Sequence, residues 1–183
     1  MPGARALRLT AQAAAVALVL ALLALLIWRV AHSESRPQHG PAPGFALPRL
    51  DGNGTLALAD LRGKGVIVNF AASWCDPCKR EAPALERTWQ RYRSRGLVVL
   101  GVDGNDFASD ARKFTRKYGL TYPFVRDPDG RILRKYGLTG FPETVFVDRR
   151  GRLVGDHIVG PIDDGENKKL FERGVAALLS ERS

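Results

Sequence analysis

The chain contains two cysteines, Cys75 and Cys78, which are separated by two residues in the segment Trp-Cys-Asp-Pro-Cys. A disulfide-stapled secreted domain would need further cysteines distant in sequence. A structural zinc site would need additional Cys or His ligands, and the sequence has neither a second cysteine pair nor a closely spaced histidine pair. A lone Cys-x-x-Cys pair between an apolar strand pattern and a helical pattern therefore predicts a redox-active dithiol.

Thiol–disulfide exchange needs one thiolate that attacks a disulfide and a second thiol that resolves the mixed disulfide. Cys75 is predicted at the start of a helix, where unpaired backbone N–H groups and the helix dipole stabilise a thiolate. Cys78, one turn further on, is the predicted resolving thiol. Pro77 suits this first turn because its missing N–H costs nothing there. Asp76 should oppose thiolate formation slightly.

The resolving thiol must gain and lose a proton, so an acid is expected nearby. Glu81 follows Cys78 by three residues and should lie on the same helix face. The alternative is that Glu81 is an ordinary solvated glutamate. Trp74 is expected to shield the sulfurs and to shape a docking surface for the substrate.

The segment Gly-Phe-Pro-Glu-Thr at residues 140–144 is the second candidate for a functional role. Phe141-Pro142 precedes a predicted strand, where a cis X-Pro turn would fit, but these residues alone leave both isomers open. Phe141 and Glu143 are candidate substrate contacts. Glu143 could instead be a surface residue at the start of the strand, and His157 is predicted to be a structural or surface histidine.

The patterning of the remaining sequence predicts an α/β fold with a central mixed sheet flanked by helices. Turn residues 51–54 lie between two short apolar segments and predict an N-terminal β-hairpin at residues 45–58. Continuous apolar runs predict buried strands. The expected elements are strands 66–70 and 97–103, an extended piece at 122–125, a hairpin at 144–148 and 153–159, and helices 79–95, 109–118, 131–136 and 163–179.

An apolar run from Ala13 to Trp28 follows Arg5 and Arg8 near the N-terminus. Extended to residues 9–31, it reaches the length that a membrane-spanning helix needs. We therefore expect a short cytoplasmic segment at 1–8, an uncleaved transmembrane signal anchor at 9–31, a flexible tether at 32–44 and a catalytic domain at 45–183. A cleaved signal peptide is the alternative. Either segment would place the domain on the extracytoplasmic side of the cell membrane.

The formal net charge of +9 does not by itself indicate a nucleic-acid-binding protein. No recognised nucleic-acid-binding motif accompanies the basic residues. Arg87, Arg91, Arg93 and Arg95 are instead expected on a solvated helix face, where they would favour an anionic membrane surface.

The soluble part of the chain resembles the TlpA/ResA/CcmG (DsbE) group of membrane-anchored, thioredoxin-like disulfide reductases. Residues 66–83 match the active-site segment of that group, residues 136–152 match its cis-proline loop and the following hairpin, and residues 45–58 match its N-terminal extension. The resemblance implies a thioredoxin-like fold with Pro142 in the cis form beside the sulfurs. Asn69 replaces the buried acid of cytosolic thioredoxins.

Because an amide cannot accept the proton of the resolving thiol, the resemblance implies that Glu81 does so, with Glu143 as a second candidate. It also implies extracytoplasmic reduction of disulfides, with the Cys75–Cys78 pair as the redox centre and no other cofactor or metal. The expected substrates are exported cysteine-containing proteins such as apocytochrome c, in cytochrome c biogenesis. The expected electron donor is a membrane thiol carrier.

Four other functions stay open from the sequence. The first is a membrane-anchored disulfide oxidase of secreted proteins, since Cys-x-x-Cys proteins span a wide range of reduction potentials. A peroxiredoxin-like peroxidase would need a different setting for Cys75. A copper-handling module would draw on His157 but normally has a longer spacing between its cysteines. The last is a purely structural or binding role.

Overall fold

The structure is a computed structural model that describes residues 3–31, 39–163 and 165–180. The chain forms two compact units, residues 1–35 and 36–183. In the first unit, α1 (Gly3–Ala31) is a single helix. Among the residues that the structure describes, no helix combines the length and the apolar character needed to cross a membrane. The anchor at residues 9–31 stays a prediction.

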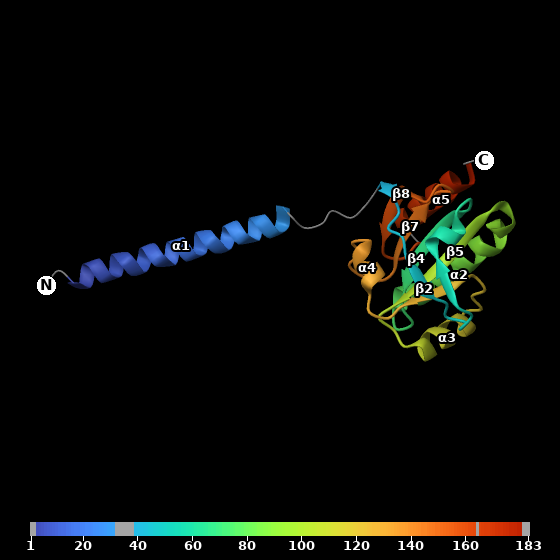
Figure 1. Ribbon diagram of the computed structural model, residues 1–183, viewed down its shortest axis with the longest axis horizontal. Helices are drawn as coiled ribbons and strands as arrows, with labels where there is room; N and C mark the ends of the chain where they lie inside the picture. Colours follow the sequence, from blue (N-terminus) through green and yellow to red (C-terminus); the bar gives the residue numbers. More distant parts are fainter. Residues whose placement is uncertain (1–2, 32–38, 164, 181–183) are drawn as a thin grey trace. The chain divides into compact units, whose positions relative to one another are not determined.

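The second unit is built on a six-stranded mixed sheet in the order β1-β8-β7-β4-β5-β6. The strand β4 lies at its centre, parallel to β5 and antiparallel to β7, and all seven of its residues are buried. Figure 1 shows β7, β4 and β5 close together in this unit. The strands are β1 (Gly40–Pro41), β4 (Gly65–Ala71), β5 (Leu97–Gly104), β6 (Phe124–Asp127), β7 (Glu143–Val147) and β8 (Arg152–Val159).

Alternate side chains of the central strands enter two apolar clusters on opposite faces of the sheet, as a strand's period of two residues requires. Ile67 joins the cluster under the helices α2, α3 and α5, whereas Val68 joins the cluster under the N-terminal hairpin and α4. The sheet is therefore covered on both faces, as the sequence predicts. These elements are β2 (Ala46–Pro48), β3 (Thr55–Ala57), α2 (Asp76–Tyr92), α3 (Ala108–Lys117), α4 (Arg131–Lys135) and α5 (Gly165–Ser180).

The predicted tether extends too far into the folded unit. Gly40 and Pro41 pair with Leu153 and Arg152 at the edge of β8, and the Ala42 N–H donates to Gly151 O at 2.9 Å. Backbone pairing and the packing of Ala42 against the core hold this stretch, which is too short to show a hydrophobic period, so the sequence pattern does not reveal it. Residues 32–38 of the predicted tether lie outside the described residues.

The helix after the cysteines begins three residues earlier than its apolar pattern, at Asp76. It continues through Pro83 to Tyr92, and a 3₁₀ turn over Arg93–Arg95 follows. Gly96 then adopts a left-handed conformation with φ of 79°, which glycine adopts without steric cost. The helix thus places Cys75 at its N-cap, the position on which the predicted chemistry depends.

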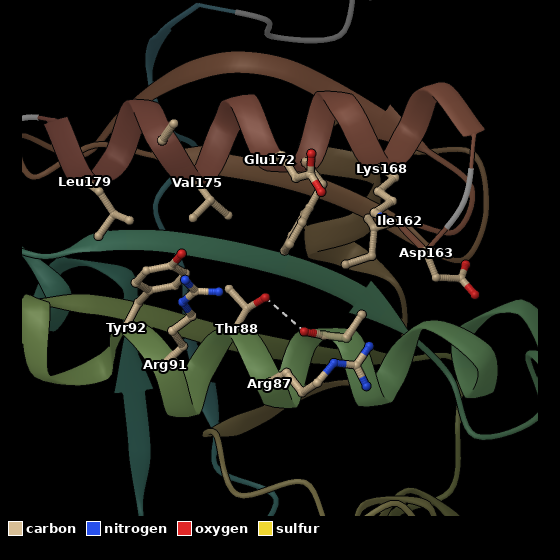
Figure 2. A pocket seen from close by; sticks show the side chains of 13 residues that line it. Arg87, Thr88, Arg91, Tyr92, Ile162, Asp163, Lys168, Glu172, Val175 and Leu179 are labelled. Carbon is tan, nitrogen blue, oxygen red and sulfur yellow. Dashed lines mark hydrogen bonds between the residues drawn. The ribbon is translucent and has the colours of Figure 1, made fainter.

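A cavity of about 580 Å³ lies between α2 and α5 (Figure 2). Thr88 and Tyr92 line it from α2, and Val175 and Leu179 line it from α5. Neither cysteine lines this cavity. The predicted redox centre lies instead at the N-terminal end of α2.

Candidate active site

Cys75 and Cys78 form a disulfide at the N-terminus of α2, with an S–S distance of 2.08 Å and Cα atoms 5.2 Å apart. Cys75 is the N-cap residue, and its Sγ accepts a hydrogen bond of 3.1 Å from the Cys78 N–H. Pro77 occupies the first turn, as predicted. The N–H groups of a first helical turn lack partners within the helix, so after reduction they would stabilise a Cys75 thiolate.

The side chains of both cysteines are buried. Cys75 is 4% exposed and Cys78 is 1% exposed, so Cys78 is the more covered of the two. They pack with Ala71 and Ala72 at the end of β4, and Phe141 packs partly against this cluster. A partner must therefore approach the disulfide from the side of Cys75.

Glu81 is a fully buried carboxyl group, three residues after Cys78 on α2. Its Oε1 accepts a hydrogen bond of 2.8 Å from Asn69 Nδ2, and its Oε2 accepts one of 3.0 Å from the Ile162 N–H. Burial raises the pKa of Glu81 to about 7, against the lowering effect of these two hydrogen bonds. The alternative of a solvated glutamate is wrong, and the group can exchange a proton near neutral pH.

Asn69 connects the sheet to this carboxyl group. Its Nδ2 also donates to Thr144 Oγ1 at 3.1 Å, so the amide bridges Glu81 and the neighbouring strand β7. We expected only that Asn69 could not serve as a proton acceptor, and sequence reasoning missed this bridging role. The available signal was a lone polar side chain in an otherwise apolar, buried strand, since such a group needs hydrogen-bond partners.

The loop before β7 contacts the cysteine cluster through Phe141. The Phe141-Pro142 peptide bond is cis, as the family resemblance implies, and Pro142 O accepts a hydrogen bond of 2.9 Å from the Gly160 N–H. Phe141 packs edge-on against Trp74 with ring centroids 5.6 Å apart. Trp74 is 58% exposed, and its Nε1 donates to Asn105 O at 3.1 Å. The two aromatic side chains thus form an apolar wall next to Cys75.

Glu143 is buried, so the alternative of a surface residue at the start of the strand is wrong. It starts β7, an inner strand of the sheet, and its Oε1 accepts hydrogen bonds from the Thr139 and Gly140 N–H groups at 2.8 and 2.9 Å. Its carboxylate therefore holds the loop and is not placed where a substrate would meet it. His157 Nε2 lies 2.7 Å from Glu143 Oε2, so this histidine belongs to the protein interior.

Asp103 and Asp106 form an acidic cluster that sequence reasoning missed. Through Asp106, this cluster holds the segment before Cys75 in place. Asp106 Oδ2 accepts a hydrogen bond of 2.6 Å from the Ser73 N–H. Asp103, at the end of β5, is 3% exposed, and Arg126 Nε lies 3.6 Å from its Oδ2. Burial and then the charge of Asp106 raise the pKa of Asp103 to about 7. The signal in the sequence was Asp103, which follows the apolar run of β5. Because β4 and β5 are parallel, this aspartate lies at the same end of the sheet as the C-terminal end of β4.

The described residues contain no group of three or more His, Cys, Asp or Glu side chains that could hold a metal ion. His157, which the copper alternative would need, meets Glu143 instead.

Residues 39–155, well over half of the chain, match the profile of the AhpC/TSA family. The chain belongs to the AhpC/TSA family. It is 37% identical over 112 residues to the thiol-disulfide oxidoreductase ResA of Geobacillus thermodenitrificans, covering 61% of this chain and 64% of that protein. It is 32% identical over 124 residues to ResA of Bacillus subtilis, covering 68% of this chain and 69% of that protein.

The fold is also that of a solved thiol:disulfide interchange protein. The crystal structure of a protein from Chlorobium tepidum, described as a putative DsbE, superposes with a TM-score of 0.72 at 31% identity. The match covers 80% of this chain and all of that one. The chain thus has the thioredoxin-like fold and groups with the ResA- and DsbE-type thiol-disulfide oxidoreductases, which use a redox-active cysteine pair.

Proposed function

We propose that this protein is a thiol-disulfide oxidoreductase that reduces disulfides in exported proteins. The observation that carries the proposal is the Cys75–Cys78 disulfide at the N-terminus of α2. The buried carboxyl group of Glu81 lies one helical turn behind Cys78. Trp74 and Phe141 provide the apolar wall beside the sulfurs. This arrangement supplies a nucleophile, a resolving thiol, a proton acceptor and a surface for the substrate.

The reaction begins with the reduced cysteine pair. The Cys75 thiolate attacks one sulfur of the substrate disulfide, the substrate S–S bond breaks, and a Cys75–substrate mixed disulfide forms while one substrate thiolate leaves. Cys78 then loses its proton and attacks Cys75 Sγ. The mixed disulfide breaks, the second substrate sulfur leaves and takes up a proton, and the Cys75–Cys78 disulfide forms. An electron pair has then passed from the cysteine pair to the substrate.

Glu81 supports the second step. A thiol attacks only as its thiolate, so Cys78 needs a proton acceptor within the protein interior. The pKa of Glu81 is raised by burial to about 7, which lets it accept this proton and release it again near neutral pH. Asn69 holds the carboxyl group in place for this transfer.

Apocytochrome c is the substrate that the family resemblance favours. Its disulfide would lie in a flexible chain segment, and only such a segment could bring a sulfur to Cys75, whose side chain is 4% exposed. A membrane thiol carrier is proposed as the dithiol that reduces the Cys75–Cys78 disulfide again. Both proposed partners, the apocytochrome c substrate and the membrane thiol carrier, are supported by the family resemblance.

We also propose that residues 45–183 work on the extracytoplasmic side of the cell membrane, anchored by residues 9–31. The support is the sequence alone, in which Arg5 and Arg8 precede the apolar run from Ala13 to Trp28. External protease added to cells without their outer wall should digest residues 45–183 while a cytoplasmic control protein stays intact. Protection of these residues until the cells are lysed would contradict this location.

The direction of electron flow is tested by the reduction potential of the cysteine pair, measured against glutathione. A reductase should have a potential between about −270 and −200 mV, whereas a value of about −150 to −120 mV would identify an oxidase of secreted proteins. Substrates are tested with Cys78→Ser, which should leave Cys75 in stable mixed disulfides with its partners. The matched control is Cys75→Ser/Cys78→Ser, which should trap none. Recovery of apocytochrome c would support the proposed substrate, and recovery of many unrelated secreted proteins would contradict it.

A further inference from the structure

A pair of buried side chains on adjacent strands lies behind the cis-proline loop, which we define as residues 139–142. Glu143 comes from β7 and His157 from β8. Their side chains are 1% and 8% exposed, and His157 Nε2 lies 2.7 Å from Glu143 Oε2. The sequence gives no reason to couple these residues, which are 14 positions apart. Their contact exists because β7 and β8 pair in antiparallel register.

The two oxygens of Glu143 face different partners. Oε1 accepts three hydrogen bonds from the cis-proline loop. The donors are the Thr139 N–H at 2.8 Å, the Gly140 N–H at 2.9 Å and the Thr139 hydroxyl at 3.2 Å. Oε2 faces His157. The carboxylate therefore connects a rigid inner strand pair to the beginning of the loop.

The loop that Glu143 holds carries the residues next to the sulfurs. Phe141 follows Gly140 directly, packs edge-on against Trp74 and contacts the cluster that contains both cysteines. At its other end, the loop is fastened by the hydrogen bond from the Gly160 N–H to Pro142 O. Its entry is fixed by Glu143, so the position of Phe141 depends on the orientation of that carboxylate.

A buried carboxylate keeps one orientation only when both of its oxygens have favourable neighbours, since a buried oxygen without a neighbour is costly. His157 supplies that neighbour for Oε2 from a strand that cannot move independently of the sheet. The 2.7 Å contact does not have hydrogen-bond geometry, so His157 favours the carboxylate as a close polar neighbour and, when protonated, through its charge.

We propose that His157 is a positioning residue for substrate docking, which acts through Glu143 to hold the cis-proline loop against Trp74. It touches neither the sulfurs nor the substrate. This inference rests on the proposed reductase function and adds to it a residue that decides how well a polypeptide docks. Loss of the His157 contact should loosen the loop, weaken substrate binding and leave the sulfur chemistry comparatively little changed.

The test is steady-state reduction of insulin disulfides, with dithiothreitol as the electron donor, by the full chain. His157→Leu has a similar volume but no donor, and it should raise KM about tenfold with a smaller change in kcat. His157→Gln keeps a donor near the position of Nε2 and should restore KM to within about threefold of the wild-type value. Both fold-changes are of the size expected for one buried polar contact to a carboxylate.

Leu153→Ala is the matched control for a purely structural role. Leu153 is buried on β8 in the apolar core, away from the loop, so this change should lower stability and leave KM unchanged. Urea unfolding of each variant shows how far stability has fallen. If Leu153→Ala raises KM as much as His157→Leu at equal loss of stability, the positioning role is overturned.

A second comparison keeps the test valid if His157→Leu folds poorly. Glu143→Gln can still accept from the loop N–H groups but is neutral, so it no longer needs a donor or cation at Oε2. In the Glu143→Gln background, adding His157→Leu should change KM less than twofold, because the two residues act as one unit. Equal effects of His157→Leu in both backgrounds would overturn the inference. Absence of insulin reduction by the wild-type chain would instead overturn the proposed function.

Discussion

The side-chain amide of Asn69 donates a hydrogen bond of 2.8 Å to Oε1 of Glu81 inside the protein, where neither residue is more than 1% exposed. Two opposing effects therefore act on the same carboxyl group. Burial raises the pKa of Glu81, and the hydrogen bond from Asn69 lowers it, with a net value of about 7. The amide of Asn69 on β4 thus lowers the pKa of Glu81 on α2 and does not itself act as the proton acceptor.

Glu81→Gln should lower kcat for insulin reduction about 100-fold, the usual size of a lost general acid–base group. In the wild type, kcat should rise as pH increases through about 7, since Glu81 accepts a proton only when it is ionised. Glu81→Gln should lack this rise. The measurement is kcat against pH for both proteins.

The control for Glu81→Gln is Glu86→Gln, which makes the same substitution five residues further along α2. Glu86 accepts hydrogen bonds from Thr121, outside the redox centre. This control should keep the wild-type pH profile. A Glu81→Gln enzyme with undiminished kcat would show that Cys78 loses its proton to another group.

Asn69→Ala should move the inflection of kcat to higher pH. The substitution removes the hydrogen bond that lowers the pKa of Glu81, while the burial that raises it remains. It also leaves a buried carboxyl oxygen without its donor, which should cost about 1–3 kcal/mol of stability. An unchanged inflection would mean that the amide does not act on Glu81. The kcat profile and urea unfolding together separate the two effects.

The free energy of unfolding should fall as pH rises from 5 to 8. A carboxyl group whose pKa is raised on folding contributes stability below its unfolded pKa and loses it as pH rises through its folded pKa. For Glu81, the change from 4.5 to about 7 corresponds to about 3 kcal/mol. Asp103 acts in the same direction.

This pH dependence is measured by urea unfolding at pH 5 and pH 8 in the wild type and in Glu81→Gln. The variant should lose less stability over this interval, because Glu81 no longer titrates there while Asp103, with its raised pKa, still does. Equal losses in the two proteins would contradict the raised pKa of Glu81.

The redox pair and the positions of the central strands along the chain were predictable because each depends on local sequence. Cys75 and Cys78 are close in the chain, and the apolar runs of β4 and β5 are continuous enough to indicate buried strands. The cis form of Pro142 was predictable only through the family resemblance, because an X-Pro bond alone does not indicate its isomer.

The contacts that orient the site were not predictable, since they join residues far apart in the chain. Glu143 resembled a surface residue because nothing nearby in the sequence reveals that β8 pairs with its strand and brings His157 to it. Asn69 and Glu81 are on different elements, and their hydrogen bond depends on how α2 packs on β4. In both cases, tertiary packing converts a polar residue of ordinary appearance into a buried partner.

Asp103 and Asp106 form an acidic cluster beside the active-site segment. The charge of Asp106 is the largest cause after burial of the raised pKa of Asp103. Asp106→Asn removes that charge, so the pKa of Asp103 should fall below about 7, as carboxyl ¹³C chemical shifts against pH would show. The neutral side chain can still accept from the Ser73 N–H, which Asp106 Oδ2 binds at 2.6 Å. The Ser73 amide should therefore keep its protection from hydrogen exchange in Asp106→Asn and lose it in Asp106→Ala. An unchanged titration of Asp103 in Asp106→Asn would show that the charge of Asp106 does not raise its pKa.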